Sequence, residues 1–238
     1  LVNDLRYEDA LFYAVCGEAL FFYGAGFTAS ATSVAGDCMP VGSGIVDIIN
    51  NQYDLGVHDL ATASEAFAAI YGDSELIEFL QSRFTVSDPL PPIFTDIANV
   101  NWKTIYTTNY DNVLETAGRY IGKDYESLTL MSDSKKTKTG ANKIFHINGY
   151  IKSLDSSVAD DIFKLSENSY LSNQFRKSHW AEIFFRDLLS AKAIFIVGYS
   201  LYDTDIKEII YNPILKKKCF IIKRPLTKPV RYEPLSKY

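Results

Sequence analysis

Two short, wholly apolar segments constrain the fold of this chain more than any other feature. They span residues 19–23 and 193–197, and neither alternates apolar with polar side chains. A strand with this pattern is buried on both faces, as in a parallel sheet that helices cover on both sides. Neither segment approaches the roughly 18–20 apolar residues that a membrane-spanning helix requires. We therefore expect an α/β protein with a mostly parallel sheet.

The remaining predicted elements alternate as such a sheet requires. Residues 45–100 show helical periodicity and no strand, which predicts a helical insert that caps the strand ends after the first strand. The expected fold class is a Rossmann-like three-layer parallel sheet, forming one domain over residues 1–238. Because the chain begins with Leu1 and not with methionine, we expect it to be part of a longer protein. Further strands are predicted over residues 103–108, 127–131, 143–147 and 218–223, and helices over residues 7–16, 112–121, 179–189 and 205–211.

Composition excludes several classes of protein. A chain with 47% hydrophobic residues is not disordered. Its net charge of −5 argues against a nucleic-acid-binding domain, which would normally be basic. The 3 cysteines lie far apart and form no C-x-x-C pair, so we expect a reducing, cytoplasmic environment and no zinc ribbon.

The first apolar segment runs directly into a glycine-rich turn that fits the pattern G-x-G-x-x-A. Glycine lets the backbone approach a phosphate closely. The small residues 28–34 are expected to open a helix, whose first N–H groups would bind an anion. The alternative is a tight turn without a ligand. The residues of this candidate phosphate-binding loop are Gly24, Ala25, Gly26, Phe27 and Thr28.

Polar residues and glycines also lie at the ends of three other predicted strands. The carboxyl ends of parallel strands meet at the sheet edge where ligands bind, so these residues are candidates for a site. Asn109 and Asp111 can instead cap the next helix, and His146 can be a buried structural residue. The candidates are Asn109, Asp111, His146, Asn148, Gly198, Ser200 and Asp203.

The order of these segments resembles that of the sirtuin-like domains of bacterial anti-phage defence proteins, which are relatives of the sirtuin deacetylases. Residues 24–28 correspond to the family's GAG-[FIL]-S loop, with threonine in place of serine. Residues 107–111 match its TTNYD segment letter for letter, and residues 198–203 match its G-x-S-x-x-D segment. The resemblance covers roughly residues 10–222.

A second position, besides Thr28, departs from the family's pattern. The family's catalytic histidine directly precedes a glycine, and this chain has Asn148 there. An asparagine cannot accept a proton, and the nearest imidazole is that of His146, two residues earlier. Residues two apart on a strand point to the same face, so His146 and Asn148 can both face one cleft if the strand continues.

The resemblance implies NAD hydrolysis and not deacetylation. Deacetylases of this family carry a four-cysteine zinc module, which this chain cannot supply. The expected reaction releases nicotinamide and ADP-ribose, uses no zinc, and depletes NAD on activation. The resemblance further implies homo-oligomers and a sensor domain or partner subunit. The implied NAD-binding residues are residues 24–28, Asn148, Gly198, Ser200 and Asp203.

The expected catalytic roles follow from the chemistry of the bond. Nicotinamide leaves as a neutral ring, so no strong general acid is needed. Two groups would accelerate the reaction: an amide near the developing oxocarbenium ion, and a base for water or a ribose hydroxyl. We assign Asn109 to the first role and to positioning water, and His146 to the second. Asp111 is expected to support the loop of Asn109.

Other functions also fit parts of the sequence. A dehydrogenase would need an acidic residue about 20 positions after the glycine turn. Asp47 lies at that distance, but in a segment that looks helical. Asn148 favours a second alternative, a catalytically impaired domain that senses NAD or ADP-ribose. A pure interaction domain is the third, although it would not need glycines and polar residues at so many strand ends.

Overall fold

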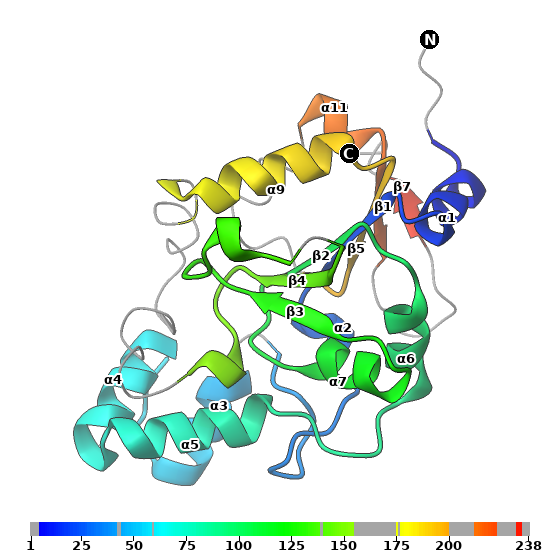
Figure 1. Ribbon diagram of the computed structural model, residues 1–238. Helices are drawn as coiled ribbons and strands as arrows, with labels where there is room; N and C mark the ends of the chain where they lie inside the picture. The colour runs from blue at the N-terminus through cyan, green and yellow to red at the C-terminus, as the bar shows by residue number, and fades with distance from the viewer. Residues whose placement is uncertain are drawn as a thin grey trace.

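A computed structural model describes residues 5–41, 44–58, 60–138, 140–154, 175, 177–199, 212–222 and 232–234. A seven-stranded sheet with the strand order β3-β4-β2-β1-β5-β6-β7 forms its centre (Figure 1). All neighbours from β3 to β6 are parallel, and β7 pairs antiparallel with β6 at one edge. The expected fold class is therefore confirmed. The strands are β1 (Ala19–Tyr23), β2 (Thr104–Thr107), β3 (Tyr125–Leu128), β4 (Asn142–His146), β5 (Ala193–Val197), β6 (Cys219–Ile222) and β7 (Tyr232–Pro234).

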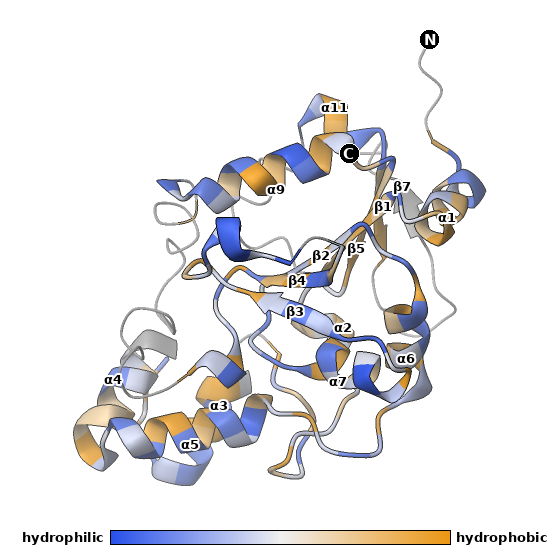
Figure 2. Cartoon of the chain, viewed as in Figure 1, coloured by the Kyte–Doolittle hydropathy of each residue, from blue (hydrophilic) through white to orange (hydrophobic). Residues whose placement is uncertain are grey.

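The two wholly apolar segments form adjacent central strands, β1 and β5. Every residue of β1 is buried. Leu20 and Phe22 face one hydrophobic cluster, whereas Phe21 and Tyr23 face the cluster on the opposite side of the sheet. Burial on both faces explains why neither strand alternates with polar residues. Figure 2 shows β1 and β5 as hydrophobic, in contrast to the mixed colours of the covering helices.

Helices cover both faces of the sheet (Figure 1). The helix α9 (His179–Ser190) packs Trp180, Phe184 and Leu188 into the cluster on one face. These residues recur every four positions, so they form a single apolar stripe. The opposite face is covered by α1 (Tyr7–Val15), α6 (Pro92–Asn99) and α7 (Val113–Tyr120). The remaining short helices are α2 (Ala25–Thr28), α11 (Pro213–Lys216), η1 (Ser134–Lys136) and η2 (Ile151–Ser153).

The predicted helical insert is present. It begins with α3 (Gly44–Tyr53), α4 (Leu60–Tyr71) and α5 (Asp73–Phe84), which share a separate hydrophobic cluster with the segment after β4. Gln81 of α5 donates a hydrogen bond to the Leu154 carbonyl, with an Nε2–O distance of 3.1 Å. The insert therefore lies beside the segment that follows the carboxyl end of β4.

Three predictions about individual elements differ from the structure. Residues 28–34 do not form a helix, because α2 ends at Thr28 and Ser33 then forms a bridge with Val86. The third strand begins and ends earlier than residues 127–131, since β3 pairs with β4 from Tyr125 onward. The edge strand β7 is an element that the sequence pattern does not predict. The helix predicted over residues 205–211 lies outside the described residues.

No helix in the described part of the chain combines the length and apolar character needed to cross a membrane.

Gly118 on α7 gives a test of this packing. A Cβ there would lie 2.7 Å from the Tyr125 ring and would also collide with the Lys123 carbonyl. We expect Gly118→Ala to lower the free energy of unfolding by about 1–3 kcal/mol, although alanine ordinarily favours a helix. Gly44→Ala on α3 is the matched control, because the nearest atom there is 4.0 Å away. Urea denaturation measures both. Equal stability of the two variants would contradict close packing of α7 on β3.

Candidate functional site

The loops that follow β1 and β2 are joined by a buried hydrogen-bonded triangle. The Thr28 hydroxyl donates to Asp111 Oδ2 over 2.9 Å. The Asn109 amide nitrogen donates both to Thr28 Oγ1 at 2.9 Å and to Asp111 Oδ2 at 3.0 Å. All three side chains are buried. The structure thus brings Thr28 together with Asn109 and Asp111, two expected site residues that lie about eighty positions later in the sequence.

This triangle orients the Asn109 amide. Both hydrogens of its nitrogen are used by Thr28 and Asp111, which leaves the oxygen Oδ1 as the free end of the group. Within the described residues, Oδ1 accepts no hydrogen bond. The arrangement therefore presents an amide oxygen at the carboxyl edge of the sheet. Such an oxygen can accept a hydrogen bond from water or stabilise a nearby positive charge.

Asp111 has a second role in the fold. Its Oδ1 accepts a hydrogen bond from the Val113 N–H over 3.1 Å, at the start of α7. The alternative of a helix-capping residue is thus observed together with the contacts to Thr28 and Asn109. Burial raises the pKa of Asp111 to about 6, because the bonds from Val113 and Thr28 only partly offset the loss of water around the charge.

The glycines of the loops after β1 and β5 contact each other directly. The Gly26 N–H donates to the Gly198 carbonyl over 2.9 Å. A Cβ on Gly26 would lie 2.8 Å from that same oxygen, and Gly198 itself has a φ of 61°. The glycine pattern is therefore needed for backbone to approach backbone. The Phe27 N–H also donates a hydrogen bond within the loop, to the Gly24 carbonyl. Phosphate binding by residues 24–28 stays a prediction.

His146 is completely buried at the end of β4, beneath the loop of Asn109. Its Nδ1 lies 2.8 Å from the Asn109 carbonyl oxygen, and its Nε2 lies 2.7 Å from Glu115 Oε1 on α7. The Tyr150 ring packs against the imidazole, with the ring centroids 4.5 Å apart. Ser127 donates a further hydrogen bond to the same oxygen of Glu115.

These contacts fix the protons of His146. A backbone carbonyl only accepts hydrogen bonds, so Nδ1 must carry a proton. Nε2 shares a proton with the Glu115 carboxylate, which leaves no lone pair on the ring for another group. Burial alone would lower the pKa of His146, but the charge and hydrogen bond of Glu115 outweigh it and raise that pKa above its ordinary value. A base role for His146 stays a prediction, and it requires the bond to Glu115 to break.

Asn148 does not share a strand face with His146, as continuation of the strand would require. The strand ends at His146, and residues 147–148 form a turn, so the alternation of faces stops there. Asn148 is only half-buried, and its amide donates to the Thr108 carbonyl over 3.1 Å. It therefore lies beside the loop after β2 and apart from the contacts of His146.

Sequence reasoning missed Glu115. This carboxylate is 4% exposed and interacts with His146, although its position within a helix suggests an ordinary solvated acid. Its spacing from Asp111, four residues earlier, would have placed both side chains on one helix face. The hydroxyl of Tyr23 is also buried, without a hydrogen-bond partner in the described residues. Its pKa is raised well above the ordinary value by burial and by the nearby charges of Asp111 and Glu115.

Two expected NAD-binding residues, Ser200 and Asp203, lie outside the described residues. Gly198 is described and contacts the first loop as set out above. In the part of the chain that is described, no group of three or more histidine, cysteine, aspartate or glutamate side chains is arranged to hold a metal ion.

Comparison with known proteins agrees with the resemblance in the sequence. Residues 103–218 match the family described as SIR2-like domain. The chain is 24% identical over 146 residues to Defense-associated sirtuin 2 of Bacillus subtilis, a match that covers 61% of this chain and 14% of that protein. The resemblance to sirtuin-like, defence-associated proteins is therefore confirmed. The chain spans only about a seventh of the length of that relative.

Two solved structures are similar in outline. One, "Structural Basis for the Mechanism and Regulation of Sir2 Enzymes", has 16% identity, a TM-score of 0.46, and coverage of 94% of this chain and 88% of that chain. The other, "The structure of Sir2Af2 bound to a myristoylated histone peptide", has 16% identity, a TM-score of 0.38, and coverage of 92% and 86%.

The charge state of His146 can be measured directly. In protein with ¹⁵N-labelled histidine, we expect NMR to show both ring nitrogens of His146 protonated at about pH 7. Glu115→Gln should lower the pKa of His146, because it removes the charge that favours the imidazolium. Glu182→Gln, the same change beside the exposed His179, is the matched control and should leave the His146 signals unchanged. A free, unprotonated Nε2 at about pH 7 would contradict the assignment.

Asp111 should make stability depend on pH. Its pKa is higher in the folded protein than in the unfolded chain, so between about pH 4 and 6 the folded state holds the extra proton. Stability relative to Asp111→Asn should therefore fall by up to about 3 kcal/mol as the pH rises through this range. Denaturation at several pH values measures the difference. Asp9→Asn, at an exposed carboxylate whose pKa is lowered by Arg6, should show a small difference of opposite sign.

Proposed function

We propose that this domain is an NAD+ glycohydrolase that acts as the effector of a bacterial anti-phage defence system. On activation it would deplete NAD in the cytoplasm by releasing nicotinamide. The SIR2-like match and the name of the Bacillus subtilis relative support NAD chemistry in defence. The proposal for the reaction itself depends on the geometry around Asn109.

The single observation that carries the proposal is the fixed Asn109 amide. Thr28 and Asp111 hold its nitrogen and leave Oδ1 without a partner among the described residues. An oxygen held in this way needs no reorganisation when positive charge develops on a neighbouring ribose, which is the condition for efficient electrostatic catalysis. Thr28 also ties the glycine loop to this amide, so NAD would extend from residues 24–28 and Gly198 toward Asn109.

The proposed reaction breaks the bond between the nicotinamide nitrogen and the ribose. The bonding electrons leave with the nicotinamide, which becomes neutral, and an oxocarbenium ion develops on the ribose. Water positioned by Asn109 Oδ1 then adds to this carbon, giving ADP-ribose, and its proton passes to solvent. His146 and Asp111 position the Asn109 loop in this scheme, one through the backbone carbonyl and the other through the side chain.

One observation favours a second function, a sensor that binds NAD or ADP-ribose without cleaving it. Asn148 replaces the family's histidine, and both ring nitrogens of His146 are occupied. The other two of the chain's 3 histidines, His58 and His179, are exposed and lie outside these contacts. A domain without an available base would bind NAD but turn it over slowly.

NAD cleavage distinguishes the two functions. The assay follows nicotinamide release by the full-length protein that carries this domain, assembled and triggered as in the cell. Asn109→Ala should lower turnover by at least about 100-fold, because it removes the preorganised oxygen. Asn51→Ala, at an exposed position of α3, is the matched control and should leave turnover unchanged.

Two results would count against the proposal, the first against the reaction and the second against its mechanism. NAD binding by calorimetry without nicotinamide release would favour the sensor. Full activity of Asn109→Ala would remove the basis of the proposed mechanism. A protein in which Asn109→Ala abolishes turnover and His146→Ala retains it would exclude His146 as the base. Because His146→Ala breaks a buried pair, its thermal unfolding should be measured alongside.

A further inference from the structure

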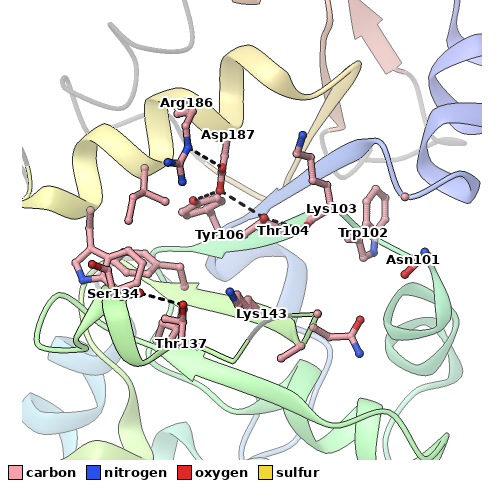
Figure 3. A pocket seen from close by; sticks show the side chains of 18 residues that line it. Asn101, Trp102, Lys103, Thr104, Tyr106, Ser134, Thr137, Lys143, Arg186 and Asp187 are labelled. Carbon is pink, nitrogen blue, oxygen red and sulfur yellow. Dashed lines mark hydrogen bonds and ion pairs between the residues drawn. The ribbon is translucent and has the colours of Figure 1, made fainter.

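A cavity lies between α9 and the sheet, near the starts of β2 and β4 (Figure 3). It has a volume of about 500 Å³, which is within the range of small-molecule sites. Its walls come from α9, the starts of β2 and β4, and the segment around η1. Thr104, at the start of β2, lines this cavity, whereas Asn109 follows the end of that strand, roughly 15 Å further along the chain. The cavity is therefore separate from the proposed NAD site.

Two strand positions in this cavity break the pattern of a buried parallel sheet. Lys143 and Thr104 lie on central strands and point to the same sheet face as Phe145 and Tyr106, their neighbours two residues later. Phe145 and Tyr106 belong to the hydrophobic cluster beneath α9. A cluster that continued to the strand starts would need apolar residues there. The polar residues end the cluster and open the cavity.

The charges around this cavity are mostly positive. Figure 3 shows Lys103 from just before β2, Lys143 from β4 and Arg186 from α9 beside the cavity. Neither lysine forms an ion pair with a carboxylate of the described residues, and Arg186 lies 4.0 Å from its neighbour Asp187. This chain carries a net charge of −5, so three cations around one cavity are a local exception.

The one acidic side chain of the cavity, among the described residues, already has partners. Asp187 Oδ2 accepts a hydrogen bond from the Tyr106 hydroxyl at 2.8 Å and another from Thr104 at 3.4 Å. These bonds hold the carboxylate against the wall, away from the two lysines, with which it forms no ion pair. The two lysines therefore remain available to a ligand, and a negatively charged ligand would form charge-assisted hydrogen bonds with them.

We propose that this cavity binds a small phosphate-bearing molecule of about the size of a mononucleotide. Lys103, Lys143 and Arg186 would bind the phosphate oxygens. Leu128, Phe145 and Trp180 line the inner wall and provide the apolar surface against which a base or sugar would pack. This site is independent of the proposed NAD reaction, so either proposal can fail without the other.

The two tryptophans of the chain make the site easy to test. Both Trp102 and Trp180 line this cavity, and the chain has no others. Titration with adenosine monophosphate or inorganic pyrophosphate, with excitation at the red edge of tryptophan absorption, should change the emission in a saturable way. Uncharged adenosine should cause no saturable change at the same concentrations, because it lacks the phosphate.

Variants of the cations provide the decisive comparison. Lys143→Met keeps the apolar stem and should weaken binding of adenosine monophosphate by about tenfold or more without lowering thermal stability. Arg186→Met, on the exposed side of α9, should weaken it similarly. Lys217→Met, at an exposed lysine outside the cavity, is the matched control and should bind like the wild type.

The outcomes separate this site from the NAD site. Asn109→Ala should retain the tryptophan response, because Asn109 does not line the cavity. The absence of a saturable response to both anions would overturn the proposal. So would equal weakening by Lys143→Met and Lys217→Met, which would indicate non-specific attraction of anions to the surface.

Discussion

The hydrogen bonds among Thr28, Asn109 and Asp111 are the interaction on which the candidate site depends. They join the loop after β1 to the loop after β2, and they also anchor the start of α7 through the Val113 N–H. Because the network is buried, the loss of any one hydrogen bond would leave a polar atom without a partner and without water. The hydrogen bonds therefore stabilise one another and are expected to form together. One set of contacts thus fixes the orientation of the amide, the entry of the chain into a helix, and the approach of two loops.

The pair of His146 and Glu115 supports this network from below. A buried ion pair contributes little net stability, because the desolvation of both charges offsets their attraction. The pair instead fixes geometry. The imidazole of His146 contacts the Asn109 backbone carbonyl, while Asp111 accepts a hydrogen bond from the Asn109 side chain. His146 is therefore part of the structural support of this loop, and a role as a base would require its bond to Glu115 to break. The familiar link between histidine and proton transfer holds only where a ring nitrogen is free.

Most of the fold could be predicted from the sequence, whereas the details of the site could not. The segments 19–23 and 193–197 indicate a doubly covered sheet, because short apolar runs that lead into turns are typical of strands buried on both faces. The predictions fail where tertiary contacts decide the local structure. The segment 28–34 lacks a helix because it pairs with the segment at Val86, and Glu115 is buried because α7 packs over His146. Neither contact has a signature in the local pattern of residues.

The contact between Gly26 and Gly198 constrains how the sequences of two loops can evolve. At the contact between the loops after β1 and β5, neither glycine leaves room for a side chain. A loop taken from a relative would therefore fit only if its counterpart came with it. Chimeras that exchange one of these loops should misfold locally, whereas exchange of both should preserve the edge. These two loops are thus expected to diverge together, although about 170 residues separate them along the chain.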